Sequence, residues 1–380
     1  MILIVIALSV LATLSVGLSI WQFVAAMGFP LHRRETRAES MPRVSVLKPL
    51  QGCDAETREC LRSWLTQVGA ADVEVLFGVD SEDDPVYEMV RGLIREYPQR
   101  AAKLVVCAER LGPNPKVSKL AQLARLAEHE VICASDADVR VPPDFLACAT
   151  APLNDPNVGL VNCFYRFANP TTFAMRWEAF AVNADFWGQV LQSVALKPMD
   201  FALGAVMIAP RARLECIGGF DALVEFLADD YELGQRIAQG GARLALAPVV
   251  VDCWTGPMRF AEVWAHQLRW ARTIRVCRPG PYFLSILGNA TFWPLCLVLA
   301  APSALVTGAV AIALVWRMAQ GLVMERKFAG RGRIDSLWMA LVKDILQVGL
   351  WAAAFAGRHV LWRGERMRVD AQGRLVRHER

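Results

Sequence analysis

The sequence predicts an α/β protein with a mostly parallel sheet, plus transmembrane helices at both ends. Hydrophobic residues make up 54% of its 380 residues, and they concentrate near the two termini. Between these regions, short apolar runs rich in β-branched residues alternate with longer helical stretches, which is typical of a parallel sheet covered by helices. This composition excludes a disordered chain and argues against a fully soluble one.

Charge and cysteine content exclude further classes. The net charge of +4 is too small to define a nucleic-acid binder, so we expect no nucleic-acid partner. The ten cysteines contain no C-x-x-C pair, which indicates free thiols rather than a zinc site or a disulfide framework.

Residues 1–30 are expected to form an N-terminal transmembrane anchor. No charged residue precedes Arg33. The apolar stretch from Ile2 to Ala26 can cross a bilayer core of about 30 Å at a rise of about 1.5 Å per residue. A cleaved signal peptide is the alternative, but it would need a basic start and a small-residue cleavage site.

Residues 282–357 are expected to form a C-terminal membrane region. The stretch before Arg317 is uncharged for long enough to form a helical hairpin, over about 282–300 and 303–323. Arg317 would then reach a membrane face.

A further apolar segment, 334–356, contains the adjacent charges Lys343 and Asp344. It is either a re-entrant or interfacial segment, with these charges against protein or water, or a plain additional span.

Basic residues orient the chain, because positive charge near membrane segments favours the cytoplasm. They follow the first anchor and the hairpin, and they recur in a basic cytosolic tail, 358–380. The residues in the first two groups are Arg33, Arg34, Arg37, Arg326, Lys327, Arg331 and Arg333. We therefore expect a multi-pass protein of the inner (plasma) membrane of a bacterium, with its central domain in the cytoplasm. The bacterial source is indicated by arginine-rich, lysine-poor usage and short loops.

The central region, 42–255, is expected to be one α/β domain. Its predicted strands are 44–47, 73–79, 104–107, 131–134 and 158–163, and its predicted helices are about 55–67, 85–96 and 117–127. Ligands of such sheets bind at the carboxyl ends of strands, and acidic residues follow two of these strands.

The acidic group that follows the predicted strand 131–134 is a D-x-D formed by Asp136 and Asp138. Two carboxylates on the same side can hold one hard divalent cation, Mg²⁺ or Mn²⁺, which can in turn hold a diphosphate. A solvated acidic turn is the alternative, although acids at the mouth of a covered sheet need a counter-charge.

A second acidic pair, Asp229 and Asp230, falls at a predicted helix start. Helix capping and the helix dipole are the ordinary explanation for acids at this position. A cap explains one aspartate and leaves one spare.

Residues 256–281 are expected to form an amphipathic interfacial helix. On a helical wheel, His266, Arg269 and Trp270 share one arc, while Gln267 lies on the mainly apolar side. A cation, an imidazole and an indole side by side could clamp a phosphate next to a sugar. A plain amphipathic helix beside the membrane is the alternative.

Taken in order, these features resemble the ceramide glucosyltransferase family. That family consists of membrane-bound, inverting enzymes of the GT-A fold, a Rossmann-type nucleotide-sugar-binding domain, with three aspartates and a Q/R-x-x-R-W motif. The matching stretches are Val44-Ser-Val-Leu-Lys-Pro-Leu50, Gly52-x-Asp54, Asp83-Asp84-Pro85, Gly112-Pro-Asn114-Pro-Lys116-Val-Ser-Lys-Leu120, Ser135-Asp136, Asp229-Asp230-Tyr231 and Arg269-Trp270.

The resemblance implies how the donor is bound. Asp84 matches the first family aspartate, expected at the uridine end of a UDP-sugar, with Asp80 and Asp83 close enough to serve instead. Asp136 matches the second, and Asp138 completes the D-x-D that would hold Mg²⁺ or Mn²⁺ on the diphosphate. Lys116, in the Asn-Pro-Lys stretch, belongs to the same donor site.

The resemblance also implies the catalytic groups. Asp230 matches the third aspartate, the general base that takes the proton from the acceptor hydroxyl. Arg269 and Trp270 match the final motif and would hold the leaving diphosphate and shape the acceptor entrance. One position departs from the motif, because His266 stands where the family has Gln or Arg, and Gln267 is one residue late. The helical arc favours His266 as the functional residue, which predicts pH-sensitive activity.

The resemblance implies transfer of a hexose from a UDP-sugar to a hydroxyl of a membrane lipid within the bilayer, with UDP-glucose and ceramide as the first expectation. A hopanoid or diacylglycerol acceptor, with UDP-N-acetylglucosamine or another UDP-hexose, is the nearest alternative. Two others are a processive polysaccharide synthase, which needs more spans, and an inactive membrane scaffold.

Overall fold

The computed structural model describes residues 1–32, 41–69, 72–332, 334, 336–357, 359–362 and 365–377. Arg33, Arg34, Arg37 and Arg333, which helped to orient the sequence, lie outside them. The chain divides into two compact units, each described here by itself. The helical unit is Met1–Pro30, Pro170–Lys197 and Pro257–Gln372, and the sheet unit is Leu31–Asn169, Pro198–Gly256 and Gly373–Arg380.

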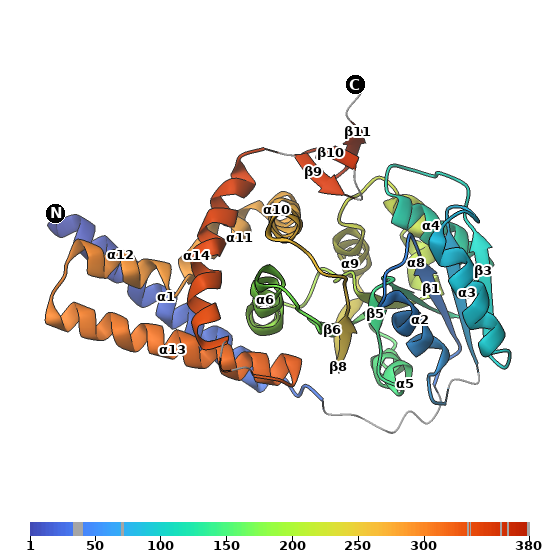
Figure 1. Ribbon diagram of the computed structural model, residues 1–380, viewed down its shortest axis with the longest axis horizontal. Coiled ribbons are helices and arrows are strands. Elements are labelled where there is room, and N and C mark those ends of the chain that lie inside the picture. Colours follow the sequence, from blue (N-terminus) through green and yellow to red (C-terminus); the bar gives the residue numbers. More distant parts are fainter. Residues whose placement is uncertain are drawn as a thin grey trace. The chain divides into compact units, whose positions relative to one another are not determined.

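The sheet unit contains an eight-stranded sheet in the order β3-β2-β1-β4-β7-β6-β8-β5 (Figure 1). Neighbours β1–β2, β2–β3, β1–β4 and β6–β8 are parallel, whereas β7 runs antiparallel to β4 and β6, and β5 to β8. The strands are β1 Val44–Pro49, β2 Val73–Val79, β3 Ala101–Val106, β4 Val131–Ser135, β5 Val139–Arg140, β6 Val158–Phe167, β7 Val206–Pro210 and β8 Arg243–Cys253. The predicted α/β class with a mostly parallel sheet is confirmed.

Helices of the sheet unit begin where the sequence supplies a cap. Asp84 accepts a hydrogen bond from the Val86 backbone N–H at the start of α3, and Asn114 accepts one from Val117 at the start of α4. A proline follows each cap, at a position where its missing N–H costs nothing. The helices are α2 Thr57–Leu65, α3 Pro85–Glu96, α4 Pro115–Leu126, α5 Phe145–Thr150, η1 Ala151–Asn154, α8 Arg211–Cys216, η3 Phe220–Leu223 and α9 Asp229–Gln239; a short strand, β11 Leu375–Arg377, also belongs to this unit.

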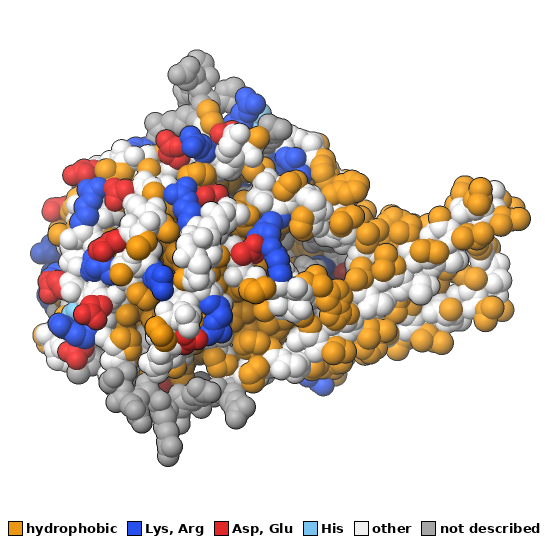
Figure 2. Space-filling view, turned by 180° about the vertical axis from the view of Figure 1, so that it is seen from behind, with side chains coloured by type: hydrophobic (Ala, Val, Ile, Leu, Met, Phe, Trp, Pro, Cys, Tyr) orange, Lys and Arg blue, Asp and Glu red, His pale blue; other side chains and the backbone are white. Residues whose placement is uncertain are grey.

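Among its described residues, the helical unit contains three helices that are long and apolar enough to cross a membrane, namely α1 Ile2–Gly28, α13 Ala304–Ala329 and α14 Ser336–Phe355. Figure 2 shows apolar side chains over the helical unit, while charged side chains gather over the sheet unit. The remaining elements are α6 Phe173–Phe180, the π-helix η2 Ala181–Phe186, α7 Trp187–Leu196, α10 Phe260–Cys277, α11 Pro279–Leu284, η4 Ser285–Gly288, α12 Phe292–Ala300, β9 His359–Trp362 and β10 Glu365–Val369.

The membrane segments differ from the expected hairpin in two ways. The expected span 282–300 is broken, because Pro279–Gly288 and Phe292–Ala300 meet at a bend of 54°. The placement of Arg317 at a membrane face is wrong, since this residue is 4% exposed and its guanidinium pairs with the carboxylates of Asp185 and Asp344. Lys343 and Asp344 are also buried, and their segment is one continuous helix, α14.

Two domain boundaries also differ from the expected ones. Residues 170–197 were expected inside the central domain, but they belong to the helical unit. The reason is packing, because their large aromatic side chains, such as Trp177 and Phe180, are buried there. The expected tail, 358–380, contains the strands β9, β10 and β11.

Candidate active site

The candidate site of the sheet unit lies where β1 and β4 end. These strands are parallel neighbours, so their carboxyl ends meet at one edge of the sheet. Asp136 and Asp138 follow β4 directly, as predicted. The Asp136 backbone N–H donates to the Ala205 carbonyl at 3.2 Å, which fixes the D-x-D next to the start of β7.

Lys48 lies beneath this turn. Its side chain is fully buried, and its ammonium donates to Ser135 Oγ at 3.2 Å and to the carbonyl oxygen of Asp136. It also lies 4.9 Å from the centre of the Trp64 ring. Burial lowers the pKa of Lys48 to about 8. The Lys-Pro-Leu stretch belongs to the family resemblance, but the sequence alone assigned Lys48 no role. A lysine at the end of a buried strand could have indicated that Lys48 belongs to the site.

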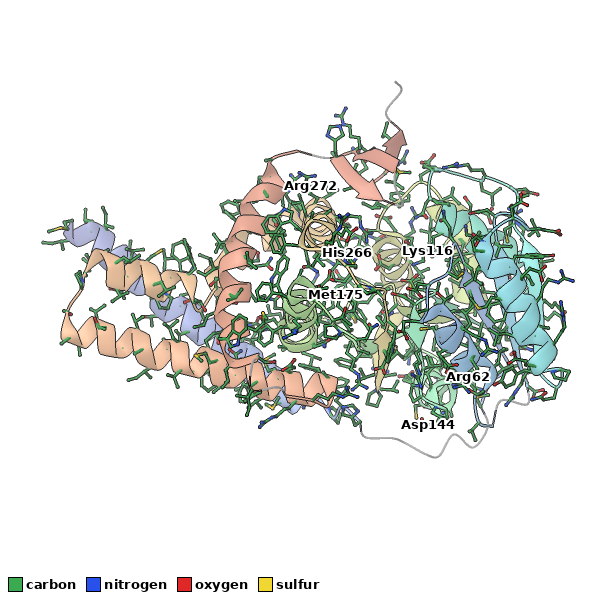
Figure 3. The ribbon with its side chains drawn as sticks, viewed as in Figure 1. Arg62, Lys116, Asp144, Met175, His266 and Arg272 are labelled. Carbon is green, nitrogen blue, oxygen red and sulfur yellow. The ribbon has the colours of Figure 1, made fainter. Side chains whose placement is uncertain are left out.

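Lys116 joins the two acidic pairs. Its ammonium lies 2.7 Å from Asp136 Oδ1 and 3.5 Å from Asp229 Oδ2. Burial lowers the pKa of Lys116, but the carboxylates of Asp136 and Asp229 outweigh burial and raise it well above its ordinary value. Lys116 therefore stays charged, and it is positioned by the first turn of α4 (Figure 3).

Asp229 and Asp230 lie in the first turn of α9, where the helix dipole favours acids, and the N-cap residue is Ala228. Asp230 Oδ1 accepts a hydrogen bond from the Tyr231 backbone N–H at 2.8 Å. Asp229 faces Lys116, so the two carboxylates have different partners. Burial, and next the charge of Asp229, raise the pKa of Asp230 to about 6.

Two glycines leave space near the start of α9: Gly204 lies beside Asp230, and Gly234 lies against the backbone before β7. A Cβ on Gly204 would lie 3.1 Å from Asp230 Oδ2, and one on Gly234 would lie 2.2 Å from the Ala202 backbone nitrogen. Glycine at position 234 therefore allows α9 to pack against the segment before β7, and glycine at position 204 keeps the carboxylate of Asp230 accessible.

The D-x-D supplies two carboxylates, which are part of the oxygen ligand set that a divalent cation requires. Burial, and next the charge of Asp136, raise the pKa of Asp138 to about 6, so this pair of carboxylates favours a counter-charge. Carboxylate oxygens suit Mg²⁺ or Mn²⁺. In the described part of the chain, no group of three or more His, Cys, Asp or Glu side chains is arranged to hold a metal. A cation on Asp136 and Asp138 would therefore need further oxygens from a diphosphate.

Asp84 and Asp80 follow β2. Both oxygens of Asp84 lie 3.0 Å from the Gly52 backbone nitrogen, and one also caps α3, so this carboxylate holds the turn after β1. Asp80 pairs with the fully buried Lys119 at 2.6 Å and is half exposed. The uridine-binding role of either residue stays a prediction.

A short loop before α9 is held from two directions. The Asn114 backbone N–H donates to the Val224 carbonyl at 2.9 Å, and its side-chain amide donates to the Phe226 carbonyl at 2.8 Å. The C-terminal segment contacts the same loop, because Leu227 N–H donates to the Gly373 carbonyl at 3.2 Å and Leu375 N–H to the Glu225 carbonyl at 2.7 Å. We call residues 373–375 the C-terminal strap.

The R-W motif lies on α10 of the helical unit. His266 Nδ1 lies 2.6 Å from Glu178 Oε1, and the Gln267 amide donates to the same oxygen at 2.8 Å (Figure 3). Glu178, on α6, is buried, as is Gln267, whereas a quarter of the His266 side chain is exposed. The rings of His266 and Trp270 are 4.8 Å apart. Sequence reasoning missed Glu178 because it is distant in the chain.

The placement agrees with the predicted arcs, since Gln267 faces the interior and His266 shares a face with Trp270. Arg269 is half buried on the same helix. The functional role of these three residues stays a prediction.

Similarity to solved structures supports the GT-A-like fold. The chain superposes on the mannosyltransferase PcManGT from Pyrobaculum calidifontis, solved in complex with GDP-Man and Mn²⁺, with a TM-score of 0.55. The two sequences are 24% identical, and the match covers 90% of this chain and 98% of that one.

Residues 3–375 match glycosyl transferase family 21, and the chain belongs to that family.

Among curated proteins, the chain is similar to two ceramide glucosyltransferases of Caenorhabditis elegans. It is 27% identical to ceramide glucosyltransferase 1 over 229 residues and 28% identical to ceramide glucosyltransferase 3 over 226 residues. Each match covers 58% of this chain, and it spans 47% and 48% of the two relatives.

Proposed function

We propose that this protein is an inverting hexosyltransferase that moves glucose from UDP-glucose to the primary hydroxyl of ceramide. The observation that carries the proposal is the cluster of Asp136, Lys116, Asp229 and Asp230 at the end of β4 and the start of α9. The family and its ceramide glucosyltransferase members supply the substrate class.

The donor side follows from charge. Asp136 and Asp138 would hold Mg²⁺ or Mn²⁺, which supplies positive charge to the diphosphate as its bond to the sugar breaks. Lys116, already charged between two carboxylates, adds a fixed positive charge to the same cluster. Lys48 holds the D-x-D turn from below.

Asp230 is the proposed base. It accepts the proton of the acceptor hydroxyl while that oxygen forms a bond to the anomeric carbon, and the electron pair of the breaking carbon–oxygen bond leaves with UDP. A single displacement inverts the configuration at the anomeric carbon. Asp229 acts differently, because its carboxylate faces Lys116.

Substitution of the two acidic sites separates these roles. We expect Asp230→Asn to lower transfer by about 10³-fold, within the range that general bases supply, while UDP binding remains. Asp136→Asn should weaken metal and donor binding together. The measurements are transfer of labelled glucose to ceramide and UDP binding by calorimetry, both on the full chain in nanodiscs.

Asp155→Asn is the matched control, because Asp155 pairs with Arg243 on the surface of the same unit and such pairs contribute little. Equal loss of donor binding in Asp230→Asn and Asp136→Asn would contradict the division of roles. Mass spectrometry of products from ceramide, diacylglycerol and a hopanoid polyol, each offered with UDP-glucose and UDP-N-acetylglucosamine, identifies the substrates.

A further inference from the structure

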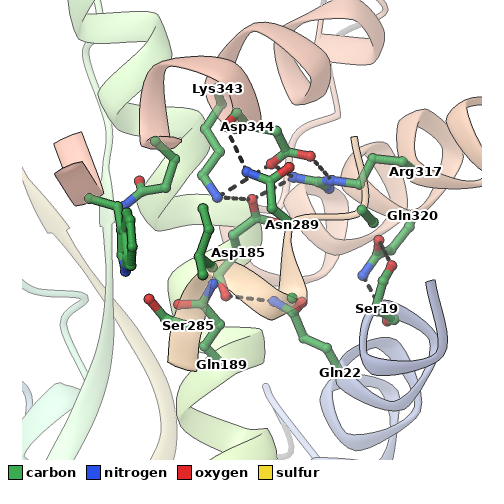
Figure 4. Close-up of a pocket in the computed structure, with 15 residues that line it drawn as sticks. Ser19, Gln22, Asp185, Gln189, Ser285, Asn289, Arg317, Gln320, Lys343 and Asp344 are labelled. Carbon is green, nitrogen blue, oxygen red and sulfur yellow. Dashed lines mark hydrogen bonds and ion pairs between the residues drawn. The ribbon is translucent and has the colours of Figure 1, made fainter. Parts of the chain in front are cut away.

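A polar cavity opens within the helical unit, among helices that are otherwise apolar (Figure 4). Its volume is about 40 Å³, which is enough for a few water-sized groups. Residues from α1, η2, α7, η4, α13 and α14 line it. The polar members are Ser19, Gln22, Asp185, Gln189, Ser285, Asn289, Arg317, Gln320, Lys343, Asp344 and Gln347.

The floor of the cavity is a buried set of four charges whose sum is zero. The Arg317 guanidinium lies 2.6 Å from Asp185 Oδ2 and 2.8 Å from Asp344 Oδ2. The Lys343 ammonium lies 2.8 Å from Asp185 Oδ2. Each of the four side chains is less than a tenth exposed. Among the described residues, Arg317 Nη1 has no hydrogen-bond partner. Because the four charges already sum to zero, an anionic group would leave a net charge in the cavity, whereas an uncharged group would not.

Irregular backbone supplies part of this floor. Asp185 comes from the π-helix η2, and the break between η4 and α12 carries Asn289 and Thr291. Asn289 donates to the Asp344 carbonyl at 2.7 Å, and the Thr291 hydroxyl donates to Asp344 Oδ2 at 2.6 Å. Broken helices inside membrane proteins are tolerated where they are buried in protein or line a cavity, and in secondary transporters they form the substrate site.

The mouth of the cavity is uncharged and polar. Gln189 and Ser285 are exposed and Gln347 is half exposed. Among the described residues, the amides of Gln189 and Gln347 have no hydrogen-bond partner. In contact with lipid, two such amides would each cost free energy unless a ligand group satisfied them.

We propose that this cavity binds the uncharged, hydroxyl- or amide-bearing head of a membrane lipid. A hydroxyl or an amide can bond to the mouth glutamines and enter the small polar space, whereas a phosphate would compete with Asp185 and Asp344 for Arg317. The inference rests on the proposed function, to which it adds a binding site in the helical unit for the uncharged acceptor lipid.

The test alters only the mouth, so that the buried charges remain intact. The triple variant Gln189→Leu, Ser285→Ala, Gln347→Leu keeps side-chain size nearly constant. Thr307→Val is the matched control, because Thr307 is exposed on α13 and does not line the cavity. Both variants and the parent chain are placed in phosphatidylcholine nanodiscs with a photoactivatable ceramide analogue.

We expect the analogue to label peptides around η4 or α14 in the parent and control, with at least a fivefold loss of label in the triple variant. Unlabelled ceramide should compete for labelling, and phosphatidylglycerol should not. The KM for ceramide should rise by about tenfold in the triple variant, with the KM for UDP-glucose unchanged.

Two results would overturn the inference. Unchanged labelling and unchanged acceptor KM in the triple variant would show that the cavity holds water alone, and competition by phosphatidylglycerol would show an anionic ligand. Labelling does not require transfer, so the two proposals fail separately. Specific labelling in a chain that transfers no sugar would leave the cavity assignment standing and remove the proposed function.

Discussion

At the residue scale, the site depends on how charge is shared between neighbouring acids. Asp229 and Asp230 are adjacent in sequence, yet Asp229 faces Lys116 and Asp230 does not receive a lysine partner at that distance. The motif that contains Lys116 associates this residue with the donor site. The structure shows in addition that Lys116 pairs with Asp229 and not with Asp230. A local pattern cannot predict that contact, because Lys116 and Asp229 are far apart in the chain.

The raised pKa of Asp230 gives the activity a definite pH dependence. A base must be deprotonated to accept a proton, so transfer should fall by about tenfold per pH unit below about pH 6 and level off above pH 7. Initial rates at saturating donor and metal measure this. The raised pKa of Asp138 weakens metal binding over the same range, and saturation removes that contribution.

A flat rate between pH 5 and pH 7 would contradict the assignment of Asp230.

The stability of the fold changes with pH in the opposite direction to the activity. A raised pKa means that protonation favours the folded state, so this stabilisation is present below pH 3.8 and is lost as the pH rises through about 6.

Glu178 is expected to position His266. Its carboxylate accepts a hydrogen bond from the Gln267 amide and contacts His266 Nδ1. This contact fixes the orientation of the imidazole ring, so Nε2 points away from Glu178. Glu178→Gln should lower kcat by roughly ten- to a hundredfold, the effect of one hydrogen bond to a charged group, and His266→Ala should lower it similarly. The measurement is steady-state kinetics with UDP-glucose and ceramide.

Gln267→Ala is the comparison variant, because Gln267 lies on the buried side of α10. Full activity of His266→Ala, combined with loss of activity in Gln267→Ala, would assign the motif position to Gln267 instead.

At the element scale, the sequence predicted part of the sheet unit, and it did not predict the strands β5, β7 and β8. Alternation of apolar strands and helices located β1, β2, β4 and α3, because these elements carry local signals: fully buried strands and a cap followed by proline. The broken span at α11, η4 and α12 was missed. Its sequence is uncharged throughout, and at the break Asn289 and Thr291 make contacts with α14 that no local pattern reports.

The C-terminal strap gives a prediction at this scale. Ending the chain after Asp370 removes the hydrogen bonds from residues 373–375 to the loop before α9. We expect at least a tenfold lower kcat with normal membrane insertion, since the loop precedes Asp229 and Asp230. Ending the chain after Arg377 is the control, because it keeps the strap. Equal activity of the two truncated proteins, measured by sugar transfer, would show that the strap has no effect on the aspartates.

At the scale of the whole molecule, hydrophobicity located the membrane segments but not their internal partners. Lys343 and Asp344 looked like obstacles to a span, and Arg317 looked like a residue at its edge. The structure pairs them with one another and with Asp185, a residue that the sequence placed in the other domain. Such pairing joins segments more than a hundred residues apart, which no local pattern reports.

The buried charge set also has a consequence for how the chain is made. Arg317 is synthesised before Asp344, and a chain that ends after α13 offers its guanidinium only Asp185. An unpaired arginine at the centre of a membrane helix costs about 2.5–3.5 kcal/mol to insert, and Asp185 supplies only one of its two carboxylate partners. We therefore expect stable insertion of α13 to depend on the later arrival of α14.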